Sequence, residues 1–362
     1  MTYTQSRLRK FARDPSYAGR HPNKRLTDVS LAILAAIERY RLIPTSLLLR
    51  LTPGNSRVIH RHLQHLYHSG LVNRLALFGR SGRPGEFNYF LDNSQALEIL
   101  VTEGEIPREH LDFEAVKRNR EKWRPLAGAS EVGEGATAAH DLEETGEGQR
   151  YFVKHELMIS RFHGMLDLAC RNSGGRIELR SWLQGPKLFR SVETPRLRDT
   201  GLLPIDSDET EVLPHRPDAF FSLFCPATGE TLNFLYEAER GTNTTTRVIK
   251  KLRSHFYYVA KTKQIREDYG IQRIRAVLIE TLNTNWAEQL RSAARHPAIS
   301  GPKPSELFWF TSSEFFAKRI EKFVGGQVKR IPYFLEHPDV IFNNLWFTAI
   351  DRVGDRPRSI LD

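Results

Sequence analysis

The chain has 362 residues, of which 40% are hydrophobic and 27% are charged, and its net charge is +10. These values are typical of globular proteins, and the length suggests about two domains. Two cysteines are too few for a disulfide scaffold or a cysteine-rich zinc site, and no apolar run suggests a signal peptide or a membrane span. We therefore expect a soluble protein of the reducing cytoplasm that makes no contact with a membrane.

The charge is distributed unevenly along the sequence. Residues 1–26 carry a net charge of +6 and residues 27–100 carry +3, whereas residues 101–150 carry −5 and the remaining residues carry +6. Basic segments at both ends favour a polyanionic partner, because Lys and Arg that neutralise phosphates release condensed counterions. A solvated basic surface without a partner is the alternative interpretation.

Residues 1–26 are polar, basic and without periodicity, which indicates a flexible arm. Residues 27–100 then show apolar spacing typical of three helices, the second beginning at Pro44 and the third ending before Gly70. Two strands follow around a tip rich in Gly, Pro and Arg, from Gly79 to Gly85. Three helices and a basic hairpin predict a winged helix-turn-helix domain, which binds double-stranded DNA.

The third helix of such a domain enters the major groove, and the wing reaches the phosphate backbone or the minor groove. At the wing tip these contacts are expected from Arg80 and Arg83. On the third helix they are expected from the residues outside its apolar stripe, which are Asn55, Ser56, Arg57, His60, Arg61 and Gln64. A module used only for packing or for forming a homodimer is the alternative.

The rest of the chain divides into three segments. Residues 101–126 are expected to form a helical connector, and the acidic, Gly-rich residues 127–149 a linker. Residues 150–362 are predicted to form a domain of mixed helices and strands in the order α-β-β-β-α-β, followed by α-β.

Three acids in this last segment could carry out chemistry on a phosphodiester. Asp218 begins one predicted strand, and Glu237 and Glu239 lie near the end of the next. Side chains two residues apart on a strand share a face, so the two glutamates point the same way, and a hairpin between the strands brings Asp218 to them. Carboxylates hold Mg²⁺ or Mn²⁺, the ions that assist phosphodiester hydrolysis.

Several short motifs here have a family resemblance. Pro217-Asp218-Ala219, residues 237–242, Lys251-Leu252 and Tyr257, together with the string KHELMISRF upstream, resemble the replication-relaxation family of plasmids and other mobile elements. The resemblance covers about residues 27–95 and 150–315. It implies an α+β or α/β protein with a winged helix-turn-helix and a restriction-endonuclease-like domain of the PD-(D/E)xK type.

The resemblance also implies roles for single residues. Asp218 and Glu237 would ligate the metal, and Glu156 on the preceding helix could add a third carboxylate. Glu239 departs from the pattern, because it stands where such nucleases usually have a lysine; Lys250 or Lys251 on the next helix could replace that cation. These implications place the protein in a bacterial cytoplasm, associated with the nucleoid or a plasmid and with other replication or mobilisation proteins.

The helix after Glu239 is also expected to contact DNA. The cations of this helix flank an apolar stripe and could face a phosphate backbone, and Arg240, which follows Glu239, could do the same. The residues expected to contact DNA here are therefore Arg240, Arg247, Lys250 and Lys251. A non-catalytic alternative remains open, in which Glu239 and Arg240 form an ion pair at a strand end. The chain would then be a DNA-binding replication or transcription regulator with a degenerate nuclease fold.

Overall fold

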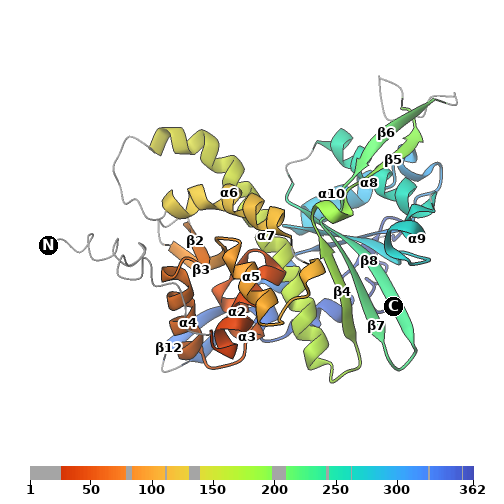
Figure 1. The fold of residues 1–362 in the computed structure, drawn as a ribbon. Coiled ribbons are helices and arrows are strands. Elements are labelled where there is room, and N and C mark those ends of the chain that lie inside the picture. Colours follow the sequence, from red (N-terminus) through yellow and green to blue (C-terminus); the bar gives the residue numbers. More distant parts are fainter. Residues whose placement is uncertain are drawn as a thin grey trace. The chain divides into compact units, whose positions relative to one another are not determined.

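The computed structural model describes residues 26–78, 84–110, 112–129, 139–197, 209–241, 244–261, 263–324, 327–352 and 354–362. The chain divides into two compact units, Met1–Gly164 and Met165–Asp362. The division lies within the long helix α7 (Ala139–Asn172), beyond the boundary expected at residue 150 (Figure 1). Helix α7 also occupies residues 139–149 of the range in which we expected a linker. The expected arm, except its last residue, lies outside the described residues.

The first unit begins with the expected three helices and two strands. The helices are α2 (Asp28–Tyr40), α3 (Thr45–Leu51) and α4 (Ser56–His68). Side chains before α2 and α4 cap these helices, since Thr27 Oγ1 accepts from the Ser30 N–H and Asn55 Oδ1 from the Val58 N–H. A three-stranded sheet follows in the order β1-β3-β2, formed by β1 (Ile43–Pro44), β2 (Val72–Phe78) and β3 (Pro84–Leu91).

The expected connector packs into this same unit. It contains a short 3-10 helix (Arg108–His110) and most of α6 (Phe113–Ala129), and α5 (Gln95–Thr102) precedes it at the end of the range expected for the winged helix. Trp123 of α6 is fully buried, and its ring meets that of Phe90 edge to face with ring centres 5.4 Å apart. Val153 of α7 joins the same apolar cluster. Helices α6 and α7 therefore cover the β2-β3 hairpin.

The second unit is built on a mixed six-stranded sheet with the order β13-β10-β9-β8-β7-β4. Strands β4, β7 and β8 form an antiparallel meander, and β8, β9 and β10 run parallel. These strands confirm the predicted mixed sheet. Their bounds are β4 (Glu178–Gln184), β7 (Ala219–Cys225), β8 (Glu230–Glu239), β9 (Ala276–Thr281), β10 (Phe308–Ser312) and the edge strand β13 (Phe347–Thr348).

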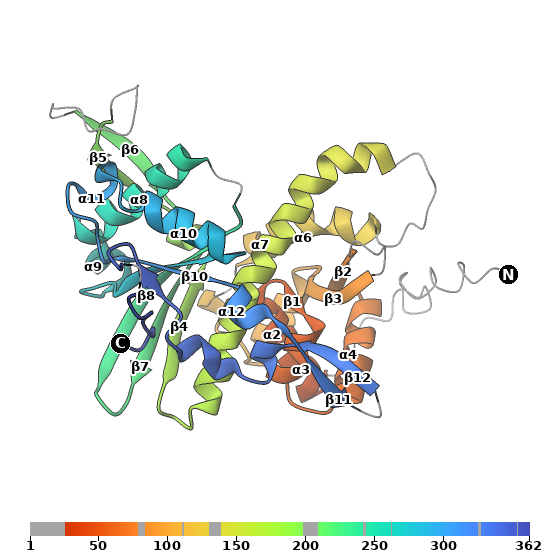
Figure 2. The same ribbon diagram turned by 180° about the vertical axis from the view of Figure 1, so that it is seen from behind.

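Helices α8 (Thr245–Ala260) and α10 (Thr284–Ala293) cover one face of this sheet (Figure 2). Leu252 of α8 and Leu290 of α10 pack there against Ile279 of β9. The edge strand β13 was not predicted, and neither were the remaining elements. They are the hairpin β5 (Arg190–Pro195) with β6 (Thr210–His215), the hairpin β11 (Arg319–Val324) with β12 (Gln327–Pro332), the short helices α9 (Gln264–Tyr269), α11 (Pro297–Ser300) and α12 (Glu314–Ala317), and three 3-10 helices, Pro186–Leu188, Tyr333–Leu335 and Pro338–Phe342.

No helix in the described part of the chain is long and apolar enough to cross a membrane.

Candidate functional site

Asp218 lies immediately before β7, at the end of the β7-β8 ladder where Glu237 of β8 also lies. The ladder ends with the pairing of Ala219 and Tyr236, which are the chain neighbours of Asp218 and Glu237. The Asp218 N–H donates to the Tyr236 carbonyl at 3.1 Å, and Asp218 Oδ2 accepts from the Ala238 N–H at 2.8 Å. These two bonds fix the Asp218 carboxylate at the end of the sheet where Glu237 lies.

Glu237 and Glu239 lie in the last three residues of β8 and are both buried, with exposed fractions of 1% and 5%. They occupy alternate positions, so they share the face that α8 covers. Burial of two carboxylates is costly unless cations or hydrogen bonds compensate their charge. The neighbouring helix must therefore supply that compensation.

Lys251 of α8 supplies it. Its ammonium nitrogen lies 2.6 Å from Glu237 Oε2 and 2.6 Å from Glu239 Oε1. The contact with Glu239 has the geometry of a hydrogen bond. The neighbouring Lys250 is exposed. Of the two lysines considered from the sequence, Lys251 is thus the one that joins the acids.

The sequence reasoning missed His255, which follows Lys251 by one helical turn. Its ring nitrogen Nε2 lies 2.7 Å from Glu237 Oε1, and both side chains are 1% exposed. The distance is that of a hydrogen bond, although neither atom makes a hydrogen bond of accepted geometry. The i, i+4 spacing of Lys251 and His255 on the face carrying Leu252 is the signal that could have found this residue.

Burial shifts the pKa values of these groups. It raises the pKa of Glu237 well above its ordinary range, although Lys251 opposes the shift. Burial acts to lower the pKa of Lys251, but Glu237, Glu239 and Asp218 together raise it well above its ordinary value. Burial, aided by Lys251, lowers the pKa of His255 to about 3. Lys251 is therefore charged and His255 neutral at neutral pH.

A small recess, partly open to solvent and with room for about one water molecule, adjoins these groups. It lies at the end of β8 and beneath α8 and α10. Its polar lining is formed by Glu237, Glu239, Lys251 and His255, and its apolar lining by Val248, Leu252, Ile279 and Leu290. In sheets with parallel strands, ligands commonly bind outside the carboxyl ends of those strands.

The turn from β8 to α8 shapes the entrance to this region. Gly241 has a backbone φ of 78°, which L side chains rarely adopt, and it lies against the ring of Trp286. Thr244 Oγ1 then caps α8 by accepting from the Arg247 N–H at 3.4 Å. This φ and the nearby Trp286 ring favour glycine at position 241.

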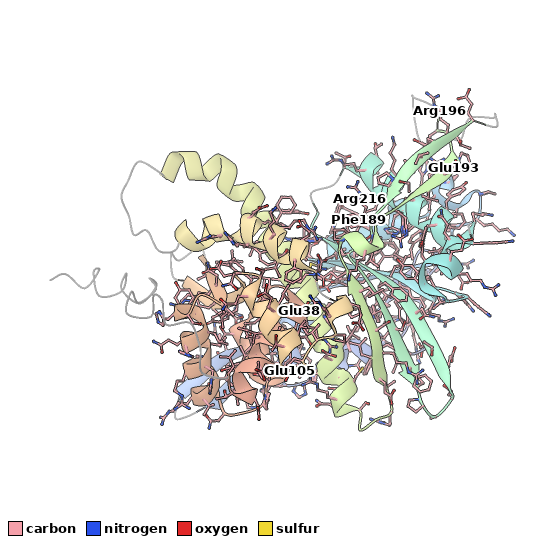
Figure 3. The ribbon with its side chains drawn as sticks, in the orientation of Figure 1. Glu38, Glu105, Phe189, Glu193, Arg196 and Arg216 are labelled. Carbon is pink, nitrogen blue, oxygen red and sulfur yellow. The ribbon has the colours of Figure 1, made fainter. Side chains whose placement is uncertain are left out.

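The cations expected to contact DNA in this unit occupy different environments. Arg247 and Lys250 are exposed on α8, whereas Arg240 is half-buried. Arg216, which was not predicted, is exposed two residues before Asp218. Its guanidinium lies 5.4 Å from the ring centre of Phe189, and Figure 3 shows the two side chains at the base of the β5-β6 hairpin.

Glu156 belongs to the first unit. It lies on α7, and its carboxylate is 3.5 Å from the ammonium of Lys122 on α6. The residues that the structure brings together in the second unit are Asp218, Glu237, Glu239 and Lys251, with the addition of His255. Among the described residues, no three His, Cys, Asp or Glu side chains are grouped as metal ligands.

In the first unit, α4 presents the expected surface. Ile59, Leu63 and Leu66 are buried. The residues predicted to contact DNA are all exposed, namely Asn55, Ser56, Arg57, His60, Arg61 and Gln64. Arg80 and Arg83, expected at the tip between β2 and β3, lie outside the described residues.

Comparison of the chain with protein-family models, with curated proteins and with solved structures found no match. The resemblance to the replication-relaxation family therefore stays a prediction from the sequence motifs.

Proposed function

We propose that the chain is a DNA-binding protein of a plasmid or other mobile element, acting in replication or mobilisation, and that its second unit is a metal-dependent DNA endonuclease. The observation that carries the proposal is the meeting of Lys251 with Glu237 and Glu239. A nuclease of the PD-(D/E)xK type needs a cation beside its acids. The sequence lacks that lysine on β8, and α8 brings Lys251 to 2.6 Å from both glutamates.

The order of elements supports the same proposal. Helix α7, strands β4, β7 and β8, helix α8 and strand β9 follow one another as α-β-β-β-α-β, with an insertion at the β5-β6 hairpin. The acids lie where the antiparallel meander meets the parallel strands. In the first unit, three helices and a hairpin with an exposed polar face on α4 support a winged helix that binds duplex DNA.

The side chains present fit Mg²⁺ or Mn²⁺. Carboxylate oxygens are the hard ligands these ions prefer, and Mg²⁺ is commonly held by one or two carboxylates together with waters and substrate phosphates. Both Glu237 oxygens are buried without a hydrogen bond of good geometry. Asp218 and Glu237 would hold the ion, which when bound would act as a Lewis acid and polarise the phosphodiester.

Lys251, Glu239 and the cations of α8 would stabilise charge on the phosphate and orient the DNA. Lys251 keeps its proton at neutral pH, so it stabilises negative charge developing on the phosphate rather than removing a proton. Glu239 holds Lys251 in place by its hydrogen bond. The exposed Arg247 and Lys250 on the same helix would attract the DNA backbone toward the recess.

The test is a nicking assay on supercoiled and linear DNA with Mg²⁺ or Mn²⁺. The wild type is expected to nick, and Asp218→Asn and Glu237→Gln to lower the rate at least about 100-fold, as expected when groups that stabilise the transition state are lost. Glu230→Gln, at the exposed start of β8, is the matched control and should retain the wild-type rate. A wild type that does not nick, or variants that nick equally well, would refute catalysis.

A second candidate is a non-catalytic DNA-binding regulator. One observation favours it: Lys251 already compensates both glutamates without an ion. This function predicts salt-sensitive, sequence-selective DNA binding that is unchanged in Asp218→Asn and Glu237→Gln. Binding as a homodimer, or together with other replication or mobilisation proteins, is compatible with either function.

A further inference from the structure

We propose that His255 is a positioning residue of the candidate site: its imidazole holds Glu237 Oε1, so that Oε2 stays directed at Lys251. The inference rests on the proposed function, because it assigns Glu237 to a metal. It adds a residue that neither the sequence motifs nor the family resemblance includes.

Each carboxylate oxygen of Glu237 lies close to one polar side-chain atom. Oε2 lies 2.6 Å from the Lys251 ammonium, and Oε1 lies 2.7 Å from His255 Nε2. A buried carboxylate oxygen that meets no donor is energetically costly, so a donor within reach is strongly favoured. The 2.7 Å separation brings His255 Nε2 within reach of Oε1, and a hydrogen bond that is poorly aligned in a free site commonly tightens when the ligand binds.

The state of the imidazole suits this role. Neither ring nitrogen of His255 has another hydrogen-bond partner, and the side chain is 1% exposed. An imidazole ring always carries at least one N–H, and the tautomer decides which ring nitrogen donates. Placing that proton on Nε2 gives Glu237 Oε1 a donor.

A row of packed groups fixes the His255 ring. His215 meets it edge to face with ring centres 4.8 Å apart, and Tyr258 stacks on His215 at 3.9 Å. The Tyr258 hydroxyl donates to Asp268, whose other oxygen lies 2.8 Å from Arg190 Nε. The row joins α8, α9 and the β5-β6 hairpin behind the acids. It restricts the movement of the ring, whose Nε2 atom lies 2.7 Å from Glu237 Oε1.

A residue that orients a metal-binding carboxylate should influence metal affinity. Groups hydrogen-bonded to metal ligands typically change affinity or activity 10–100-fold when they are replaced. The chain offers a matched pair of substitutions. The amide nitrogen of glutamine reaches about as far as histidine Nε2, whereas that of asparagine ends near the position of Nδ1.

The experiment is a Mn²⁺ titration of the full-length protein, followed by isothermal calorimetry or by the electron spin resonance of free Mn²⁺. We expect His255→Gln to bind Mn²⁺ within about threefold of wild type, and His255→Asn to bind about 10–100-fold more weakly. Ser254→Ala is the control, since Ser254 is buried on the same helix and donates to the Pro214 carbonyl, away from Glu237. The Mn²⁺ concentration for half-maximal nicking should follow the same order, with a smaller change in the maximal rate.

Equal Mn²⁺ affinity in wild type and His255→Asn would overturn the inference, as would an equal loss in His255→Gln and His255→Asn. Thermal unfolding identifies a misfolded variant. If His255→Asn does not fold, His255→Leu takes its place as the variant without a donor. A wild type that neither binds Mn²⁺ nor nicks DNA would overturn the nuclease function and the inference together, whereas the first two results leave the nuclease function standing.

Discussion

The ammonium of Lys251 and the Oε2 atom of Glu237 lie 2.6 Å apart, although one comes from a helix and the other from the strand before it. The lysine thus compensates an acid that is almost completely buried. Removing one partner of a buried ion pair leaves the other charge uncompensated, which costs more than the pair itself contributes. This relationship makes Lys251 important both for stability and for the proposed chemistry.

Lys251→Met is expected to lower the free energy of unfolding by about 1–2 kcal/mol in metal-free buffer. The value lies below the roughly 3–5 kcal/mol typical of breaking a fully buried pair, because a third of the Lys251 side chain is exposed. Denaturant unfolding measures the change, and the nicking rate should fall about 100-fold. Lys250→Met, on the exposed neighbour, is the control. Equal behaviour of the two variants would remove Lys251 from the site.

Acid stability should depend on His215, whose ring is fully buried and whose nitrogens have no hydrogen-bond partner. Burial lowers its pKa to about 2, with His255 adding to the shift. The unfolded chain takes up this proton below about pH 6.5 while the folded chain does not. The stability is therefore present above that pH and is lost as the pH falls toward 2, by up to about 1.4 kcal/mol per pH unit.

His215→Phe should remove this pH dependence of the unfolding free energy while keeping a ring stacked on Tyr258. We expect a flatter fall of the unfolding free energy between pH 6.5 and 4, measured by urea unfolding at several pH values. His296→Phe is the comparison, because His296 is only partly buried. A wild-type slope in His215→Phe would show that the His215 ring is not the acid-sensitive group.

DNA binding through α4 should depend on its exposed arginines. Arg57→Ala combined with Arg61→Ala is expected to weaken binding to duplex DNA and to reduce the slope of log Kd against log salt by about 2, since each lost phosphate contact removes roughly 0.9. Fluorescence anisotropy at several salt concentrations measures both values. Lys117→Ala, an exposed cation on α6, is the control. An unchanged slope in the double variant would place the DNA elsewhere.

Much of this fold could be predicted because its strands are apolar runs of ordinary length. Ala276–Thr281 is buried at every position, and Glu230–Glu239 is buried from Leu232 onward. Because side chains two residues apart on a strand point to the same side, the sequence also placed Glu237 and Glu239 on one face of β8. The hairpin β5-β6 was missed because Pro195 and Pro214 and its many charges hide the alternation, and only its inner face, with Val192 and Leu213, is buried.

Contacts between elements were harder to predict from the sequence. Helical spacing shows that Lys251 and His255 share a face, but it does not show which strand residue that face meets. That contact depends on the Gly241 turn and on the packing of Leu252 against the sheet. The same limit applies to Glu156, whose partner in the first unit is Lys122 and could not be read from periodicity.

Two substitutions of Asp218 separate its structural role from its chemical role. Asp218 Oδ2 accepts from the Ala238 N–H at 2.8 Å, so Asp218→Asn can keep this bond through its amide oxygen, whereas Asp218→Ala leaves a backbone donor without its partner. We expect Asp218→Ala to lose about 1–2 kcal/mol of unfolding free energy and Asp218→Asn less than half of that. Both should lose nicking and Mn²⁺ affinity, because both remove the charge. If Asp218→Asn keeps wild-type Mn²⁺ affinity, Asp218 serves only to join β7 to β8, and the metal must be held by Glu237 without it.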